Sequence, residues 1–492
     1  MFNMKFHAAI VIAAVMLAGC DDSGGSKGGG KISASWAASA PSASNESSFN
    51  SVTTDPTGNV YAAGYISGSN NFELGNGQTV GGAYAGGANA ALVKYDSAGN
   101  VQWARSVVSA PGSSHFWAVQ TDAQGYVYAA GDINSTGEFD FGNGQTAQGT
   151  ASRNVVIVKY NASGVALWAR SIIAGTDLNG FNALTVDRNG NVYAAGFINS
   201  TATYNFGNGK TAAGNGQNNL VLVKYDSAGA AQWAKSVTAS ATSPTPISNF
   251  YGAASDADGN IYAAGIICGD GLTFNFGNSV TKTGSTWGIM VLVKYSDSGT
   301  TLWAKTVAGY NSYWSCIAVD TDGNIILGGY TANTGSYDFG NSVTASGAHS
   351  SWNFLVAKYD SEGDARWAST TTTATNNSYC YDVSIDDDGS VYAVGQISGA
   401  EPFGFGNGVT VTGANTSSNC VLVKYGADGK PRSVKTVRSG PSSSWFNSVK
   451  TGSGGCIYGA GAMEGIGPFD FGDGVSASGG YSGYNLLLLQ YN

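Results

Sequence analysis

A tryptophan-containing strand motif occurs seven times in this chain, and one copy stands apart from the others. Six copies end successive repeats: VQWARSV (101–107), ALWARSI (166–172), AQWAKSV (231–237), TLWAKTV (301–307), ARWASTT (365–371) and the degenerate PRSVKTV (431–437). The seventh, ASWAASA (34–40), precedes the first repeat, whereas the last repeat stops at LLLLQYN (486–492). An array that carries its missing last strand at its other end is typical of a closed ring, because the two ends can complete each other.

The repeat is marked by one position at intervals of 64 to 69 residues, occupied by Tyr61, Tyr128, Tyr193, Tyr262, Ile326, Tyr392 and Tyr458. Each unit has four strand-like segments, which in the first copy are 49–55, 59–66, 91–96 and the tryptophan strand. Val, Ile, Tyr, Thr and Trp fill these segments, and Gly, Asp, Asn and Ser separate them. Seven units of four strands predict an all-β fold, a seven-bladed β-propeller whose last blade is closed by 34–40. An open β-solenoid is the alternative, but its ends need polar caps and it has no use for a displaced strand.

The repeat motifs resemble a known family. D-x-x-G-N-V-Y-A-A-G, followed by V-K-Y-D-S-x-G and W-A-[RK]-S, is similar to the bacterial β-propeller repeat called SBBP over residues 32–492. The resemblance implies a single extracytoplasmic propeller domain and no particular activity, because members share none. The chain departs from the pattern at Ser433, in place of Trp, and at Gly452 and Cys456, in place of Asp and Asn. We expect these two units to be less well packed.

The first residues predict export and a lipid anchor. Lys5 and His7 precede the apolar run 8–17, which is too short for a typical membrane span, so 1–19 is interpreted as a signal peptide. Leu17-Ala18-Gly19-Cys20 resembles a bacterial lipobox, which implies cleavage before Cys20 and acylation of its thiol. Residues 20–31 then form a Gly/Ser-rich tether to a bilayer, with the membrane, inner or outer, left open. The alternative is an ordinary signal peptide with a coincidental cysteine.

Composition argues against a nucleic-acid partner. The formal net charge is −9 and only 11% of residues are charged, so no basic surface is expected. The remaining partners are the bilayer, through Cys20, and an unidentified protein or glycan.

Two repeated loops are interpreted as structural. The turn that begins with Asp resembles the start of a calcium loop in Asp256–Asn260 and Asp320–Asn324, but most copies lack enough carboxylates, so a β-turn is favoured and no metal is expected. The F-G-N-G segments, such as 140–146, predict small hairpins with Asn-Gly turns. No cofactor motif is present.

Catalytic residues are not indicated. His115 and His349 lie at unrelated repeat positions, and two carboxylates, Asp132 and Asp382, interrupt the repeat in different units. A carboxylate pair could hydrolyse a glycoside, but a hydrogen-bonded or solvated role is favoured. The repeated lysines of the third strand, such as Lys159 and Lys224, are expected to solvate the outer surface rather than converge on an anion.

The start of the first strand in each unit is the preferred ligand surface. The repeated Phe (for example Phe49) is interpreted as core, because a core position should recur. Trp117, Tyr251, Tyr381 and Trp445 vary between units and are the candidate ligand-binding residues. The sequence therefore favours a non-catalytic binding scaffold at the bacterial envelope, with a carbohydrate-active hydrolase or lyase as the alternative and an outer-membrane assembly factor as a variant of the scaffold.

Overall fold

The computed structural model describes residues 32–240, 245–309 and 311–492, and their regular structure is all-β apart from one 3-10 turn, Ser453–Gly455. The predicted signal peptide and tether, with Cys20, lie outside the described residues. Within these ranges, no helix is both long and apolar enough to cross a bilayer.

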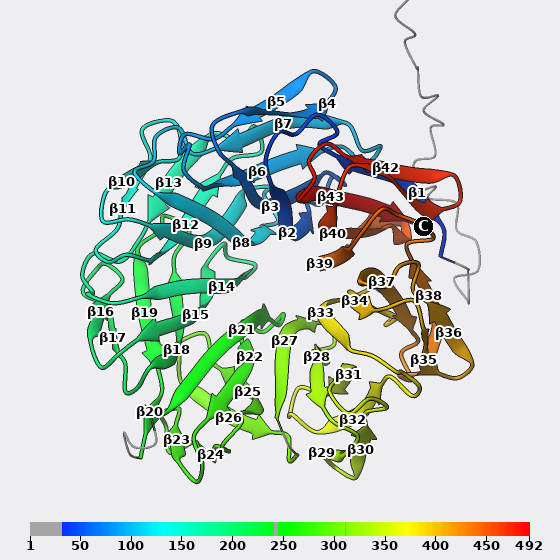
Figure 1. Ribbon diagram of the computed structural model, residues 1–492. Helices are drawn as coiled ribbons and strands as arrows, with labels where there is room; N and C mark the ends of the chain where they lie inside the picture. Colours follow the sequence, from blue (N-terminus) through cyan, green and yellow to red (C-terminus); the bar gives the residue numbers. More distant parts are fainter. Residues whose placement is uncertain (1–31, 241–244, 310) are drawn as a thin grey trace, which may run out of the picture.

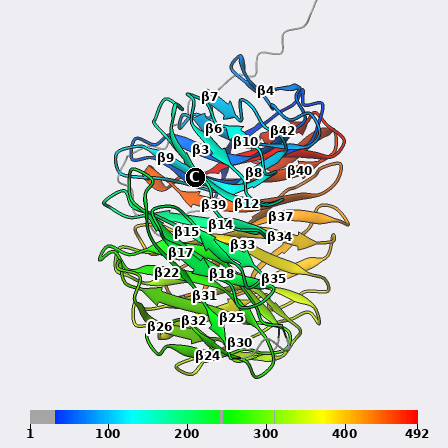
Figure 2. The ribbon, with the colours of Figure 1, turned by 90° about the vertical axis from the view of Figure 1, so that its left-hand side faces the viewer.

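The strands form sets of four that follow one another along the chain. Five sheets contain four strands each, and one eight-stranded sheet consists of two further sets joined by a single parallel pairing of Asn218 with Ile247. Figure 1 shows the sets arranged in sequence order around a common centre, and Figure 2 shows them from the side. We name each set after its innermost strand.

The innermost strands lie nearest the centre in Figure 1 and contact those of the neighbouring sets, with β39 against β2. They are β2 (Ser47–Thr54), β8 (Ser113–Thr121), β14 (Asn179–Val186), β21 (Ile247–Ser255), β27 (Ser312–Val319), β33 (Ser378–Ile385) and β39 (Ser444–Thr451). The second strands are β3 (Val60–Ser67), β9 (Val127–Asn134), β15 (Val192–Asn199), β22 (Ile261–Cys268), β28 (Ile325–Ala332), β34 (Val391–Ser398) and β40 (Ile457–Glu464). The third strands are β6 (Ala88–Tyr95), β12 (Asn154–Tyr160), β18 (Asn218–Tyr225), β25 (Ile289–Tyr295), β31 (Trp352–Tyr359), β37 (Ser418–Tyr425) and β43 (Tyr484–Tyr491). The outer strands are β7 (Val101–Ser106), β13 (Ala166–Arg170), β19 (Ala231–Ser236), β26 (Thr301–Thr306), β32 (Ala365–Thr370), β38 (Pro431–Thr436) and β1 (Ala34–Ser39).

The F-G-N-G segments form the predicted hairpins between second and third strands. These are β4 (Asn71–Gly75) with β5 (Gln78–Gly81), β10 (Glu138–Asp140) with β11 (Thr146–Gln148), β16 (Thr203–Asn205) with β17 (Thr211–Ala213), β23 (Thr273–Asn275) with β24 (Thr281–Thr283), β29 (Ser336–Gly340) with β30 (Val343–Ser346), β35 (Pro402–Gly406) with β36 (Val409–Thr412) and β41 (Gly467–Gly472) with β42 (Val475–Gly479). The short β20 (Thr238–Ala239) pairs with β23.

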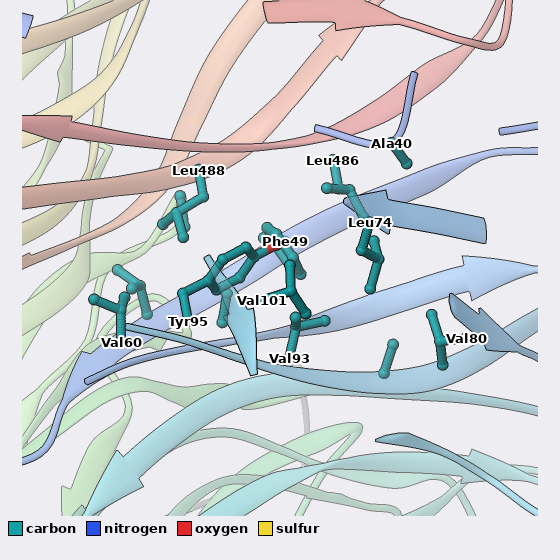
Figure 3. Packing of buried hydrophobic residues seen from close by; sticks show 14 of the residues in the cluster. Ala40, Phe49, Val60, Leu74, Val80, Val93, Tyr95, Val101, Leu486 and Leu488 are labelled. Carbon is teal, nitrogen blue, oxygen red and sulfur yellow. The ribbon is translucent and has the colours of Figure 1, made fainter. Parts of the chain in front are cut away.

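The predicted exchange of the terminal strand is confirmed. β1 runs antiparallel to β43, with Trp36 opposite Gln490, and the backbones of Ser33 and Asn492 exchange hydrogen bonds of 3.0 and 2.9 Å. Leu486 and Leu488 of β43 share a buried cluster with Phe49 and Tyr95 of the β2 set (Figure 3). Burying apolar side chains between the first and last sets opposes their separation.

Each outer tryptophan rests on the turn between third and outer strands of the next set. The indole of Trp103 donates to the Ala162 carbonyl at 3.0 Å, and Trp168 donates to Ser227 at 3.2 Å. A glycine with positive φ faces each ring: a Cβ on Gly229 would lie 2.9 Å from the Trp168 ring. The motifs W-A-[RK]-S and S-x-G are therefore two halves of one inter-set contact.

The third-strand lysines join the same contact, so the expectation that they solvate the outer surface is wrong. The Lys159 ammonium donates to the Ser227 carbonyl at 3.2 Å, and Lys294 donates to Ser361 at 3.0 Å. Lys159 and Lys224 are buried. Five of the six ammonium groups lie over a tyrosine ring of their own set, as Lys294 does 5.0 Å from the Tyr262 ring centroid, whereas Lys358 pairs with Ile326.

The departure at Ser433 has a physical counterpart directly before β1. Ile32 lies four residues before Trp36, the place that Gly229 has relative to Trp233. Its buried side chain shares a cluster with Tyr392, the residue whose counterparts pack on tryptophan, as Tyr193 does on Trp233. We infer that isoleucine supplies at this seam the volume that tryptophan supplies at the others, so the small Ser433 is compensated.

Candidate functional site

A ring of bulged residues lines the centre of the molecule. In every innermost strand the register shifts directly after the repeated Phe position, as between Phe49 and Ser51, and leaves one extra residue. These extra residues are Asn50, Trp117, Asn182, Tyr251, Ser315, Tyr381 and Asn447, and all line a central cavity of about 390 Å³. Three of the predicted ligand residues, Trp117, Tyr251 and Tyr381, thus occupy one level of one cavity.

The polar members of this ring hold neighbouring sets together. Asn50 donates to the Phe116 carbonyl at 2.9 Å, and Asn182 donates to the Phe250 carbonyl at 2.8 Å. Asn447 repeats the bond to Phe49 at 2.9 Å. An aromatic side chain cannot donate this hydrogen bond of the asparagine amide. Linking neighbouring sets therefore does not explain the three aromatic residues of the ring.

Trp117 and Tyr251 also line a second, upper cavity of about 340 Å³. Tyr313 and Tyr330 complete its aromatic wall, and sequence reasoning missed both. Tyr330 makes edge contacts with Trp352 at 5.1 Å and Tyr379 at 5.2 Å between ring centroids. This aromatic wall offers half-buried faces to a ligand, and burial raises the pKa of Tyr251, so its phenol stays neutral.

The other two predicted residues lie differently. Tyr381 stacks on Tyr379 at 5.9 Å and faces the central cavity, so it extends the aromatic wall inward. Trp445 does not line either cavity and packs edge-on against Tyr484 at 5.1 Å. The repeated Phe position is buried in all its copies, as the core interpretation predicted; Phe49, Phe116 and Phe181 are examples.

Beside Trp117 lies a charged cluster that sequence reasoning did not assemble. Asp132, 1% exposed, accepts hydrogen bonds from His115 Nδ1 at 3.3 Å, from Arg153 at 2.9 Å and from the Trp117 indole. The His115 ring stacks on Trp117 at 5.1 Å and meets Tyr65 edge-on at 5.3 Å. The interpretation of Asp132 as a hydrogen-bonded variant is confirmed.

The partners of Asp132 decide its charge. Burial by itself would raise the pKa of this carboxyl, but the His115 hydrogen bond and the Arg153 charge outweigh burial and hold the pKa below its usual value. Asp132 is therefore an anion that fixes His115 and Trp117 at the rim of the cavity. A histidine oriented by a buried carboxylate can exchange a proton with a ligand.

A register signal could have revealed this cluster. His115 directly precedes the repeated Phe116 and Asp132 directly follows the repeated Gly131. The repeated Phe position pairs with Gly across these strands in every set, as Phe49 does with Gly64, although two sets carry Trp314 or Cys380 in place of Phe. The two variant residues were therefore cross-strand neighbours. Arg153 precedes the third strand and needed the three-dimensional structure.

The other variant carboxylate faces the lower part of the cavity. Asp382 accepts hydrogen bonds from Ser448 Oγ at 2.7 Å and from the Val449 amide at 2.9 Å. Burial raises its pKa to about 6. Asp382 and Lys450 are the charged side chains among the described residues that line the central cavity.

The Asp-containing turns satisfy their own carboxylates. Asp55 accepts from the amides of Thr57 and Asn59 at 2.9 and 3.0 Å and from the Tyr61 hydroxyl at 2.9 Å. This is the predicted β-turn. Across the described ranges, no group of three or more His, Cys, Asp or Glu side chains could hold a metal ion.

No protein-family model and no curated protein matches the chain. Solved structures with distant similarity include a polysaccharide lyase described as PL25-Ulvanlyase, with 10% identity over 86% of this chain and 93% of that chain and a TM-score of 0.44. A chain of the mitotic checkpoint complex has 10% identity over 93% of this chain and 94% of that chain, with a TM-score of 0.41. Virginiamycin B lyase from Staphylococcus aureus has 10% identity over 76% and 93%, with a TM-score of 0.36. No functional inference follows from similarities this distant.

Proposed function

We propose that the protein is a seven-bladed β-propeller, anchored to a bacterial membrane through an acylated Cys20, that acts as a non-catalytic binding scaffold at the cell envelope. Each four-strand set is one blade, and the contact of β39 with β2 together with the pairing of β1 with β43 supports a closed ring. The lipobox-like segment before Cys20 supports the anchor.

The single observation that carries the binding proposal is the aromatic wall at the upper cavity. Trp117, Tyr251, Tyr313 and Tyr330 converge on one space, although the repeat requires no aromatic residue there. Flat aromatic faces with few charges suit the apolar faces of sugar rings, so a glycan is the favoured ligand, and a protein loop is the other outcome of the test.

The experiment is a binding screen with the mature chain against envelope glycans and against detergent-solubilised envelope proteins. Trp117→Ala and Tyr251→Ala should each weaken binding of the captured ligand about 5- to 150-fold, since stacking on one aromatic ring contributes about 1–3 kcal/mol to binding. Trp445→Ala is the matched control, because Trp445 packs on Tyr484 outside the cavity. Equal binding by all variants would place the site elsewhere.

A carbohydrate-active hydrolase or lyase is the second candidate, and one observation favours it. His115, oriented by Asp132, lies against the same Trp117 that lines the cavity, so a proton-transfer group stands beside the aromatic wall. If the protein were such an enzyme, His115→Asn would abolish turnover and leave glycan affinity nearly unchanged. If it is a scaffold, incubation with the bound glycan yields no shortened product.

A further inference from the structure

A cavity of about 720 Å³ lies at the seam where the ring closes, on the side of the molecule where the Asp-containing turns lie. It is lined by Lys424 of the β33 set, Lys450 and the turn Gly452–Gly455 of the β39 set, and Ile32. Lys450 also lines the central cavity, so the two cavities meet at this side chain.

Lys424 lacks the acceptor that the repeat supplies to four of its counterparts. Lys94, Lys159, Lys224 and Lys294 donate to the second residue of the next set's outer turn, as Lys94 does to the Ala162 carbonyl at 3.2 Å, whereas the Lys358 ammonium lies 4.0 Å from the Asp320 carboxylate. At the seam this turn is replaced by the pairing of Ser33 with Asn492. Among the described residues, none accepts a hydrogen bond from the Lys424 ammonium, which lies 5.2 Å from the Tyr392 ring centroid.

Lys450 is an added positive charge. The same position in the other innermost strands carries Thr53, Gln120, Thr185, Ala254, Ala318 and Ser384. The half-buried ammonium has no hydrogen bond or ion pair with a described residue, and burial lowers its pKa although Asp382 partly opposes this. A nearby anion would compensate its charge.

The turn beside Lys450 has lost a negative charge. Gly452 stands where Asp55 and its counterparts bind the turn amides, so this turn of the β39 set has no carboxylate of its own. Within two residues the last set has therefore gained an ammonium and lost a carboxylate. Both changes face the same cavity.

The acidic residues of the cavity leave the lysines available. Asp55, Asp122 and Asp386 are engaged by their own turns. Asp387 and Asp388 are exposed and make no ion pair with Lys424 or Lys450. These two carboxylates weaken, by repulsion, whatever anion approaches the cavity.

We propose that the seam cavity is an oxyanion site in which Lys424 and Lys450 bind a phosphate group. Ile32 lines the cavity, and the twelve residues 20–31 reach at most about 40 Å from it, so under the proposed anchoring at Cys20 the site lies within reach of a bilayer surface. The phosphate belongs either to a free anion or to a lipid headgroup. The site is separate from the aromatic wall.

The test uses the mature chain with Cys20→Ser, which keeps the tether and the whole ring. Calorimetric titration with inorganic phosphate at low ionic strength should show saturable binding. Lys450→Thr, which restores the residue of the first unit, and Lys424→Met should each weaken it at least tenfold. Lys294→Met is the matched control, because Lys294 keeps its Ser361 acceptor. Asp387→Asn with Asp388→Asn should tighten binding.

A second arm measures sedimentation with phosphatidylglycerol vesicles. If phosphate competes with vesicle binding and Lys450→Thr abolishes it, the ligand is a lipid headgroup. If phosphate binds and vesicles do not, the ligand is the free anion. Absence of phosphate and vesicle binding, or unchanged affinity in Lys450→Thr, overturns the proposal. Trp117→Ala should leave phosphate binding intact. The proposal for the aromatic site and the proposal for the seam site can therefore fail independently. Thermal melting verifies that each variant is folded.

Discussion

At the scale of single residues, Asp382 makes folding depend on pH. Its folded pKa of about 6 lies above the value of about 3.9 in an unfolded chain, so the folded state binds its proton more tightly. This contribution to stability is fully present below pH 4 and is lost as the pH rises through 6. Two pKa units correspond to at most about 3 kcal/mol.

The measurement is the free energy of unfolding from denaturant titrations between pH 4 and 7. The wild type should lose stability over this interval relative to Asp382→Asn, in which the titrating group is absent while the amide oxygen can still accept from Ser448 and Val449. Parallel pH profiles for the two proteins would show that the carboxyl does not titrate in this window.

Asp132 is the opposite case, an anion whose partners depend on it. Asp132→Ala removes the acceptor of Arg153, His115 and Trp117 together and leaves the Arg153 charge, one-third exposed, without its carboxylate. We expect a loss of about 2–3 kcal/mol in unfolding free energy. Asp132→Asn keeps one acceptor and should lose less, and equal losses for both variants would contradict a role for the charge.

The residue scale also shows what a sequence can predict here. Trp117, Tyr251 and Tyr381 were found because they interrupt a repeat, and a repeat fixes which positions share a level. Arg153 and Tyr330 could not be found in this way, because their approach to Asp132 and Tyr379 depends on side-chain directions between strands and sets. Trp445 shares the variability and yet lies outside the cavities, so variability alone does not select ligand contacts.

At the scale of elements, the outer turn and the tryptophan strand form one interlocking contact. Gly229 has a φ of 79°, and its added Cβ would meet the Trp168 ring at 2.9 Å. Gly474, in the β41–β42 hairpin, has a φ of 83° with no atom near the added Cβ. Substitution of Gly474 by alanine therefore tests backbone strain alone, whereas substitution of Gly229 tests strain together with steric contact.

Gly474→Ala should cost about 1–2 kcal/mol of unfolding free energy, the cost of a left-handed conformation for alanine. Gly229→Ala should cost about 1–3 kcal/mol more, because the indole must move and its bond to Ser227 weakens. Denaturant unfolding followed by tryptophan fluorescence measures both. Equal costs would show that the ring does not press on the turn.

The element scale was the most predictable from sequence. Strand order, hairpins and the Asp-containing turns follow from motifs that recur in fixed order, and the structure has them at the expected places. The environment of the third-strand lysines was not predictable, because their acceptors belong to the next set and residue type alone suggests exposure.

At the scale of the whole molecule, the pairing of β1 with β43 links two substitutions that lie about four hundred residues apart in the sequence. Ile32 occupies the place of a glycine, and Ser433 occupies the place of a tryptophan. If the Ile32 side chain fills the space that tryptophan fills in the other sets, Ser433→Trp alone overfills the seam. This variant should lose about 1–3 kcal/mol of unfolding free energy. Ile32→Gly alone leaves a cavity beside Tyr392 and should cost about 2–5 kcal/mol.

The double variant Ile32→Gly, Ser433→Trp rebuilds the contact that the other sets use. Its loss of unfolding free energy should therefore be well below the sum of the two single losses. A double-mutant cycle in denaturant measures this coupling, which for residues in contact is about 0.5–3 kcal/mol. Leu167→Ala, exposed on β13, serves as the unrelated partner for a control cycle with Ser433→Trp and should be additive. Additive losses in the test cycle would mean that Ser433 and Ile32 do not share a space. A positive coupling would mean instead that the two ends of the chain pack as one unit, and that the β39 set replaces an interlocked turn by buried aliphatic volume.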